Sequence, residues 1–131
     1  MSFQQGLSGL NAASKNLDVI GHNIANSNTV GFKASRAEFA EMVASAIGSA
    51  GGSNAGIGVE VGAVAQQFTQ GNLTITGNSL DVAINGNGFF TLTLPDGTAA
   101  YTRSGNFKLD KEGNMITNDN AKVMGLSLIH I

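Results

Sequence analysis

The sequence contains no cysteine or tryptophan, only one proline, and few charged side chains. Without cysteine, neither a disulfide framework nor a thiolate metal site can form. The two histidines, His22 and His130, lie far apart in the sequence, which argues against a histidine-based metal cluster. Charged residues make up 12% of the chain and the net charge is -2, so the clustered Lys and Arg of a nucleic-acid surface are missing.

Long apolar runs are also missing. No run reaches the length that spans a bilayer, so membrane insertion is not expected. The first residues lack a basic segment followed by an apolar run, so they do not read as a secretory signal peptide. What remains is a chain of 131 residues with 18 glycines and 6% aromatics, which suggests one small domain or two half-sized pieces.

The first feature present is a long helical pattern from about residue 3 to residue 27. Its apolar residues recur every three or four positions, which draws a narrow stripe down one side of a helix. Several members are seven residues apart, close to a heptad repeat. Such a narrow stripe cannot bury itself and predicts a partner helix. The stripe consists of Phe3, Leu7, Leu10, Ala13, Leu17, Ile20 and Ile24.

A helix-stop motif rich in Asn follows directly. Asn and Ser compete for backbone hydrogen bonds and favour helix ends, while Gly31 permits a turn. The motif residues are Asn23, Ala25, Asn26, Thr29, Gly31, Phe32 and Lys33.

Residues 34–56 form the next predicted region. Good helix formers and scattered apolar residues from Ala34 to Ala46 fit either a short helix or an extended arm. Residues 48–56 are all Gly, Ser, Ala or Asn, which predicts a flexible linker.

From residue 57 onward the apolar period changes to two, which predicts an antiparallel, mostly β module up to about residue 125. Strands are expected at 57–61, 73–76, 80–84, 88–94 and 99–103, with a hairpin over 106–117. The predicted core consists of Leu80, Val82, Ile84, Phe90, Leu92 and Phe107. The fold class is therefore α+β, divided into 1–33, 34–56, 57–125 and an atypical tail at 126–131.

No constellation indicates catalysis or a cofactor. The Gly86-Asn87-Gly88 run lacks the Lys and spacing of a phosphate loop and reads as a tight turn. The acidic run Asp110–Asn114 lacks the ligand spacing of a calcium loop and reads as a hairpin turn. His22 is a lone helix histidine, and no serine lies in a nucleophile elbow. We expect no enzyme activity, no cofactor and no metal.

The combined motifs resemble the bacterial flagellar rod and hook proteins. The segments Leu17–Asn26 and Thr29–Lys33 carry the resemblance in the helical part. In the β part it is carried by Gln70-Gly71, Thr76–Phe90, Tyr101–Phe107, Leu109-Asp110 and Gly113. The opening residues Met1–Phe3 and Gly6–Ala13 are similar to hook members rather than rod members.

This resemblance implies a structural subunit of the flagellar hook that polymerises helically into the tubular joint between rod and filament and supports flagellum-dependent motility. It implies other axial proteins, the hook cap and the flagellar type III export apparatus as partners, and a place in the hook and basal body outside the cell. Head-to-tail contacts that do not close a ring produce such filaments. A rod subunit is the alternative within the family.

The chain also departs from the family pattern. Hook proteins are longer and end in a second striped helix that pairs with the first, so we expect this chain to be an N-terminal portion with a tail of foreign or misread sequence. A reading from another class is a monomeric β binding module with a helical anchor. That reading needs an exposed aromatic cluster, and only Tyr101, Phe89, Phe90 and Phe107 are available for it.

Overall fold

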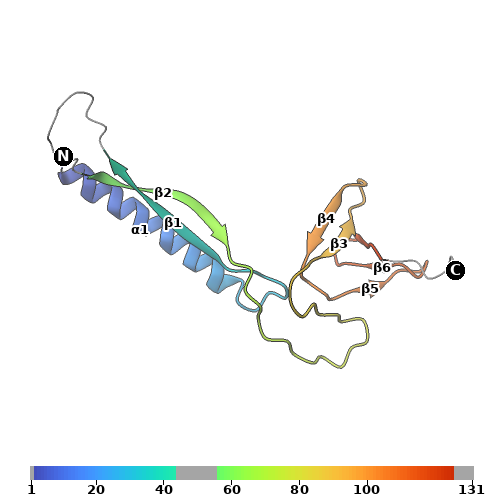
Figure 1. Cartoon of the computed structure of the whole chain (residues 1–131). Coiled ribbons are helices and arrows are strands. Elements are labelled where there is room, and N and C mark those ends of the chain that lie inside the picture. The colour runs from blue at the N-terminus through green and yellow to red at the C-terminus, as the bar shows by residue number, and fades with distance from the viewer. Residues whose placement is uncertain (1, 44–55, 126–131) are drawn as a thin grey trace. The chain divides into compact units, whose positions relative to one another are not determined.

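The structure is a computed structural model, and it describes residues 2–43 and 56–125. The chain divides into two compact units. The first contains the N-terminal helix and a hairpin, from residues 1–27 and 33–68, and the second contains residues 28–32 and the chain from Thr69 onward. The α+β prediction is confirmed, with one helix followed by antiparallel sheets (Figure 1).

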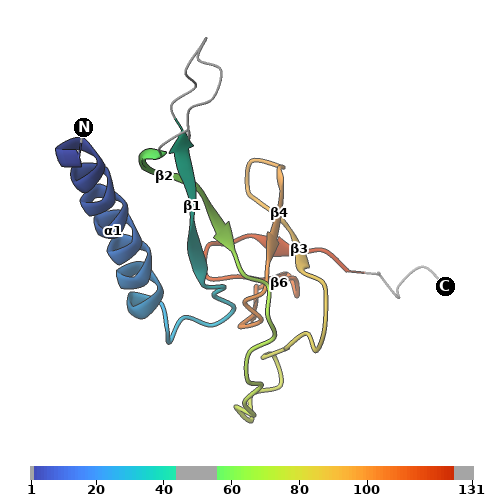
Figure 2. The ribbon, with the colours of Figure 1, turned by 60° about the vertical axis from the view of Figure 1, so that its left-hand side comes forward.

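The first unit consists of helix α1 (Ser2–Ala25) and strands β1 (Ser35–Val43) and β2 (Gly56–Gln66). The two strands pair antiparallel, and α1 runs alongside them (Figures 1 and 2). Glu38 pairs with Ala63 and Phe39 with Val61, so Gly62 is an extra residue that forms a bulge. The extended arm was therefore the correct alternative for the residues before the glycine-rich stretch. Most of that predicted linker, residues 44–55, lies outside the described residues.

The strand predicted at 57–61 exists, but it does not belong to the β module. It forms part of β2 and pairs with β1, so the module begins only after Phe68. A period-two pattern shows that a strand forms without showing which strand will pair with it, and this is why the predicted boundary at residue 57 was misplaced.

The second unit holds a five-stranded antiparallel sheet in the order β4-β3-β7-β6-β5. Its strands are β3 (Phe90–Thr93), β4 (Ala99–Thr102), β5 (Lys108–Leu109), β6 (Met115–Ile116) and β7 (Lys122–Val123). The predicted strands at 88–94 and 99–103 and the hairpin over 106–117 are confirmed.

The strands predicted at 73–76 and 80–84 do not form in the described part of the chain. Only an isolated bridge between Asp81 and Asn106 occurs there. Ile75 is fully exposed. Because a strand needs a neighbour for its backbone groups, an alternating pattern without a neighbouring strand stays irregular.

The core of the second unit is small. Leu92 and Phe107 are buried, as predicted, together with Ala121, which the sequence did not single out. The rings of Phe90 and Phe107 meet edge to face with centroids 5.1 Å apart. Phe90, Leu80 and Ile84 are half-buried. Val82 is 44% exposed, so its assignment to the core was wrong, since the segment that carries it joins no sheet.

Candidate assembly interface

Helix α1 has one face that packs on the hairpin, and most of its side chains are small or polar. Ala12 is buried in this face. The half-buried members are Ser8, Gly9, Asn16, Val19 and Asn23, followed by Asn26 directly after the helix. Small residues allow a helix and a strand to approach closely. The chain's own hairpin therefore packs closely on this face and covers it.

Polar contacts fix the N-terminal half of this face on β2. The Gln5 side-chain amide donates to the Gly56 carbonyl at 2.8 Å, and the Val59 backbone N–H donates to the Ser8 hydroxyl oxygen at 3.3 Å. A Cβ atom at Gly58 would lie 2.4 Å from the Ser8 oxygen. The close approach therefore depends on glycine in the strand and serine on the helix.

A reciprocal pair of hydrogen bonds fixes the other end. The Asn23 side-chain amide donates to the Ser35 carbonyl at 2.7 Å, and the Ser35 N–H donates to the Asn23 side-chain oxygen at 2.9 Å. One side chain thus satisfies both backbone groups of the first residue of β1. Asn23 was assigned to the helix stop, and the structure shows that it also joins the helix to the hairpin.

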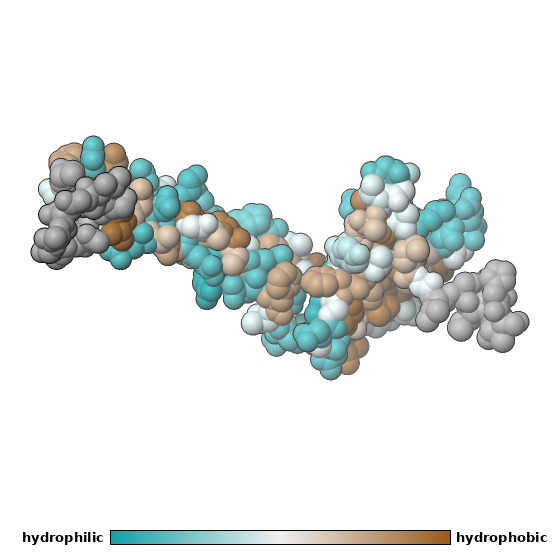
Figure 3. All heavy atoms as spheres, turned by 45° about the horizontal axis from the view of Figure 1, so that its top comes forward, coloured by the Kyte–Doolittle hydropathy of each residue, from teal (hydrophilic) through white to brown (hydrophobic). Residues whose placement is uncertain are grey.

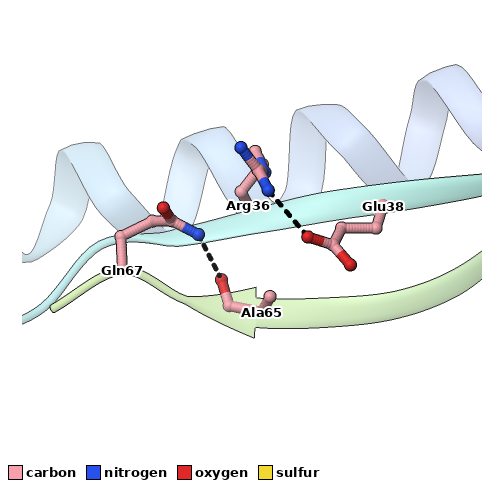
Figure 4. Close-up of polar contacts among 4 residues, drawn as sticks. All are labelled: Arg36, Glu38, Ala65 and Gln67. Atoms are coloured by element: carbon pink, nitrogen blue, oxygen red, sulfur yellow. Dashed lines mark hydrogen bonds and ion pairs between the residues drawn. The ribbon is translucent and has the colours of Figure 1, made fainter.

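Surface charge contributes little to this unit. Figure 4 shows Arg36 and Glu38, two residues apart on β1, with a guanidinium nitrogen 2.7 Å from a carboxylate oxygen. Both side chains are exposed, and exposed ion pairs contribute at most about 1 kcal/mol. Nearby, the Gln67 side-chain amide donates to the Ala65 carbonyl at 3.5 Å. The backbone ladder and the small-residue face therefore hold the hairpin to the helix.

The predicted apolar stripe lies on a different face of α1. Successive residues are about 100° apart around a helix, so Leu10 and Ala12, or Leu17 and Val19, lie almost opposite each other. The hairpin covers Ala12 and not Leu10. All seven stripe residues are exposed, and the six large ones range from 43% for Ile20 to 91% for Phe3. Figure 3 shows brown, apolar atoms reaching the surface of this unit.

A third face is polar. It contains Gln4, Asn11, Lys15, Asp18 and His22, all of them exposed. The helix therefore combines a face used within the chain, a face suited to water, and an apolar face that the described residues leave uncovered. Contiguous exposed apolar residues rimmed by polar ones typically mark an interaction site.

The stop motif ends the helix close to the predicted position, at Ala25. The Asn26 side-chain amide donates to the His22 carbonyl at 3.0 Å, and the Ser27 N–H donates to the Ile24 carbonyl at 3.2 Å. These bonds occupy carbonyl groups that the last helical turn leaves open. Gly31 has φ of 77°, which confirms its predicted turn.

Within residues 2–43 and 56–125, no three His, Cys, Asp or Glu side chains form a group that could hold a metal ion. No helix in the described part of the chain is long and apolar enough to cross a membrane. The aromatic residues of the binding-module alternative have mixed exposure, since Tyr101 is exposed but Phe107 is buried in the core.

The small-residue face was not among the features predicted from the sequence. The sequence contains this face as a second series of residues spaced by three or four on the same helix, offset by two positions from the apolar stripe. Arg103 was also missed. Its guanidinium lies 5.6 Å from the centroid of the Phe89 ring and donates to the Ile84 carbonyl at 3.1 Å.

Two protein families match separate parts of the chain. Residues 3–33 match the family described as flagella basal body rod protein. Residues 83–131 match the family described as flagellar hook protein FlgE/F/G D1 domain. The first match covers helix α1 and the stop motif, and the second covers the five-stranded sheet.

Whole-chain relatives agree with both matches. The chain is 50% identical over 125 residues to flagellar hook protein FlgE of Salmonella typhimurium, covering 95% of this chain and 29% of the relative. FlgE of Escherichia coli K12 gives the same identity and coverage. Flagellar basal-body rod protein FlgG of Bacillus subtilis is 43% identical over an alignment of 136 residues, covering 96% of this chain and 51% of the relative. The chain thus spans under a third of the hook relatives and about half of the rod relative, and it is similar to both kinds of protein over most of its own length.

Proposed function

We propose that the protein is a structural subunit of the flagellar hook, and that it assembles with copies of itself through the apolar stripe of α1. The observation that carries this proposal is the exposure of all seven stripe residues on a helix whose opposite face is already occupied. The chain's own hairpin leaves this surface open to another helix.

The hook is favoured over the rod by the degree of identity, 50% to hook relatives against 43% to the Bacillus subtilis rod relative. The rod remains the second candidate, because a rod protein family matches the helix. We infer that the chain is not an enzyme, because the families and relatives that it matches are named as hook and rod proteins.

The family supports a place in the flagellar hook and basal body. We further propose the hook cap, neighbouring axial proteins and the flagellar type III export apparatus as partners, in support of flagellum-dependent motility. The stripe on helix α1 would pack against a helix of another subunit as in a coiled coil. Residues seven apart would then repeat the same contact.

The experiment is a charge placed in the stripe of the full-length subunit. We expect Leu17→Asp to abolish polymerisation, observed by sedimentation and by electron microscopy of hooks on cells. Burying an unpaired carboxylate in an apolar seam costs several kcal/mol per subunit contact. The control is Asn11→Asp, which adds the same charge to the polar face. Normal hooks formed by the Leu17→Asp subunit would overturn the assignment.

A further inference from the structure

Residues 28–32 form a tight turn that belongs to the β module although it follows the helix directly. The Phe32 N–H donates to the Thr29 carbonyl at 3.2 Å, which closes a four-residue turn. Gly31 occupies its third position with φ of 77°, as a type II turn requires. These residues are grouped with the chain from Thr69 onward and not with the helix and hairpin.

Gly31 touches the backbone of the module. A Cβ atom at this position would lie 2.4 Å from the Ser104 nitrogen and 2.6 Å from the Arg103 carbonyl carbon. Both distances are far below ordinary contact, and backbone atoms cannot rotate away as a flexible side chain can. Other positive-φ glycines of the module differ in this respect, because Gly77, Gly97 and Gly113 have no heavy atom within 4 Å of such a Cβ.

The segment that receives Gly31 is itself held in place. The Arg103 guanidinium donates to the carbonyls of Ile84 and Gly86. The Val82 N–H donates to the Gly105 carbonyl at 2.9 Å. The Asn106 side-chain amide donates to the Asp81 carboxylate at 3.3 Å. Gly31 therefore contacts a backbone segment that several hydrogen bonds hold in place.

This placement changes how the two units are connected. The chain passes from one unit to the other after Ser27, again after Phe32, and a third time after Phe68. If residues 28–32 were not held by the module, only the last passage would join the units. Two units joined by one linker rotate about its single bonds, whereas additional connections restrict that rotation.

We propose that residues 28–32 are an anchor of the β module. Because Gly31 is held against the Arg103–Ser104 backbone, the chain joins the two units at three places instead of one. The anchor limits swivelling of the module about the helix and hairpin. Its use in the polymer rests on the proposed function, since a subunit of a joint has to pass rotation from one unit to the other. Its existence does not rest on that function.

The test compares Gly31→Ala with Gly77→Ala in the 131-residue chain. The two glycines have nearly equal φ angles, 77° and 76°, so the strain of placing alanine in a left-handed conformation is matched. Only Gly31 adds the collision with backbone. Trypsin cleavage after Lys33, directly beyond the anchor, and hydrogen exchange of residues 28–33 report its release. Cleavage after Lys122 reports unfolding of the module.

We expect Gly31→Ala to raise the cleavage rate after Lys33 and the exchange rate of residues 28–33 by about tenfold or more, and Gly77→Ala to raise them far less. Equal effects of the two substitutions, or no effect of Gly31→Ala, would overturn the anchor. If Gly31→Ala unfolds the module while Gly77→Ala does not, the anchor is supported, since residue 31 then acts as part of the module. Polymerisation of the full-length subunit is measured separately, so the proposed function can fail while the anchor stands.

Discussion

At the scale of single residues, small side chains determine the closest approaches in this protein. An added Cβ at Gly58 would meet the Ser8 hydroxyl, one at Gly31 would meet the Ser104 backbone, and one at Gly105 would collide with the Val82 carbonyl oxygen. Large apolar side chains contribute little burial in comparison, because Leu92 and Phe107 are the only large ones buried among the described residues. Substitutions at those two positions should therefore have large effects.

Phe107→Ala should lower the free energy of unfolding of the β module by about 3–5 kcal/mol, the usual cost of emptying a buried aromatic site. The ring is 4% exposed and also supports Phe90 edge to face. Thermal unfolding followed by circular dichroism measures the change. Phe90→Ala should cost less, because Phe90 is only half-buried. Tyr101→Ala, at a 70% exposed position, is the control. A similar loss from Tyr101→Ala would show that the core is misplaced.

The turn after β3 contains a carboxylate whose ionisation is linked to folding. The Thr98 hydroxyl and backbone N–H both donate to the Asp96 carboxylate, at 2.7 Å and 3.0 Å, and they lower its pKa below the ordinary value. A lowered pKa in the folded state means that the turn favours ionised Asp96. Its contribution is complete above about pH 4 and disappears as pH falls through the lower folded-state pKa.

Nuclear magnetic resonance titration of the Asp96 carboxyl carbon should therefore give a midpoint below that of an unstructured peptide. Thr98→Val removes the hydroxyl but keeps the backbone donor, so it should return the midpoint part of the way. A midpoint that does not move on Thr98→Val would show that the hydroxyl bond has no influence on the carboxylate.

At the scale of elements, the local sequence pattern predicted whether a helix or strand forms better than it predicted which strands pair. The stripe from Phe3 to Ile24 predicted the helix, because a period near 3.6 admits few other readings. Residues 57–61 were correctly predicted as a strand, but their partner β1 could not be identified, since strand pairing is a long-range choice. Residues 73–76 carry the same alternation as β3 and stay irregular for lack of a neighbour. The anchoring of residues 28–32 was out of reach, because it depends on backbone atoms more than 70 positions away.

The attachment of α1 to the hairpin has its own test. Asn23→Ala removes both hydrogen bonds to Ser35 and leaves a part-buried N–H and carbonyl without that partner. We expect the first unit to lose about 1–3 kcal/mol, the usual penalty for an unsatisfied backbone group. Loss of the helical circular dichroism signal at lower denaturant concentration would measure it. Asn11→Ala, on the exposed polar face, is the matched control, and equal loss in both variants would show that the Asn23 bonds contribute nothing.

At the scale of the whole molecule, neither unit has a core of ordinary size. In the first unit only Ala12 and Ala37 are buried among the described residues, and both side chains are small. Folded domains keep only about 5–15 kcal/mol of net stability, and burial is its main source. The apolar surface that would stabilise the first unit lies instead on the exposed stripe. Much of its stability should therefore come from assembly.

The two units should consequently unfold separately when the chain is alone. We expect hydrogen exchange to be faster for α1, β1 and β2 than for β3, which lies inside the larger sheet and carries buried Leu92. A stripe substitution such as Leu17→Ala should leave exchange in the isolated chain almost unchanged, because Leu17 is already 67% exposed there. In the polymer of the full-length subunit, the same substitution should raise exchange along α1. Protection of α1 equal to that of β3 in a verified monomer would contradict this view, since the stripe would then be unnecessary for stability.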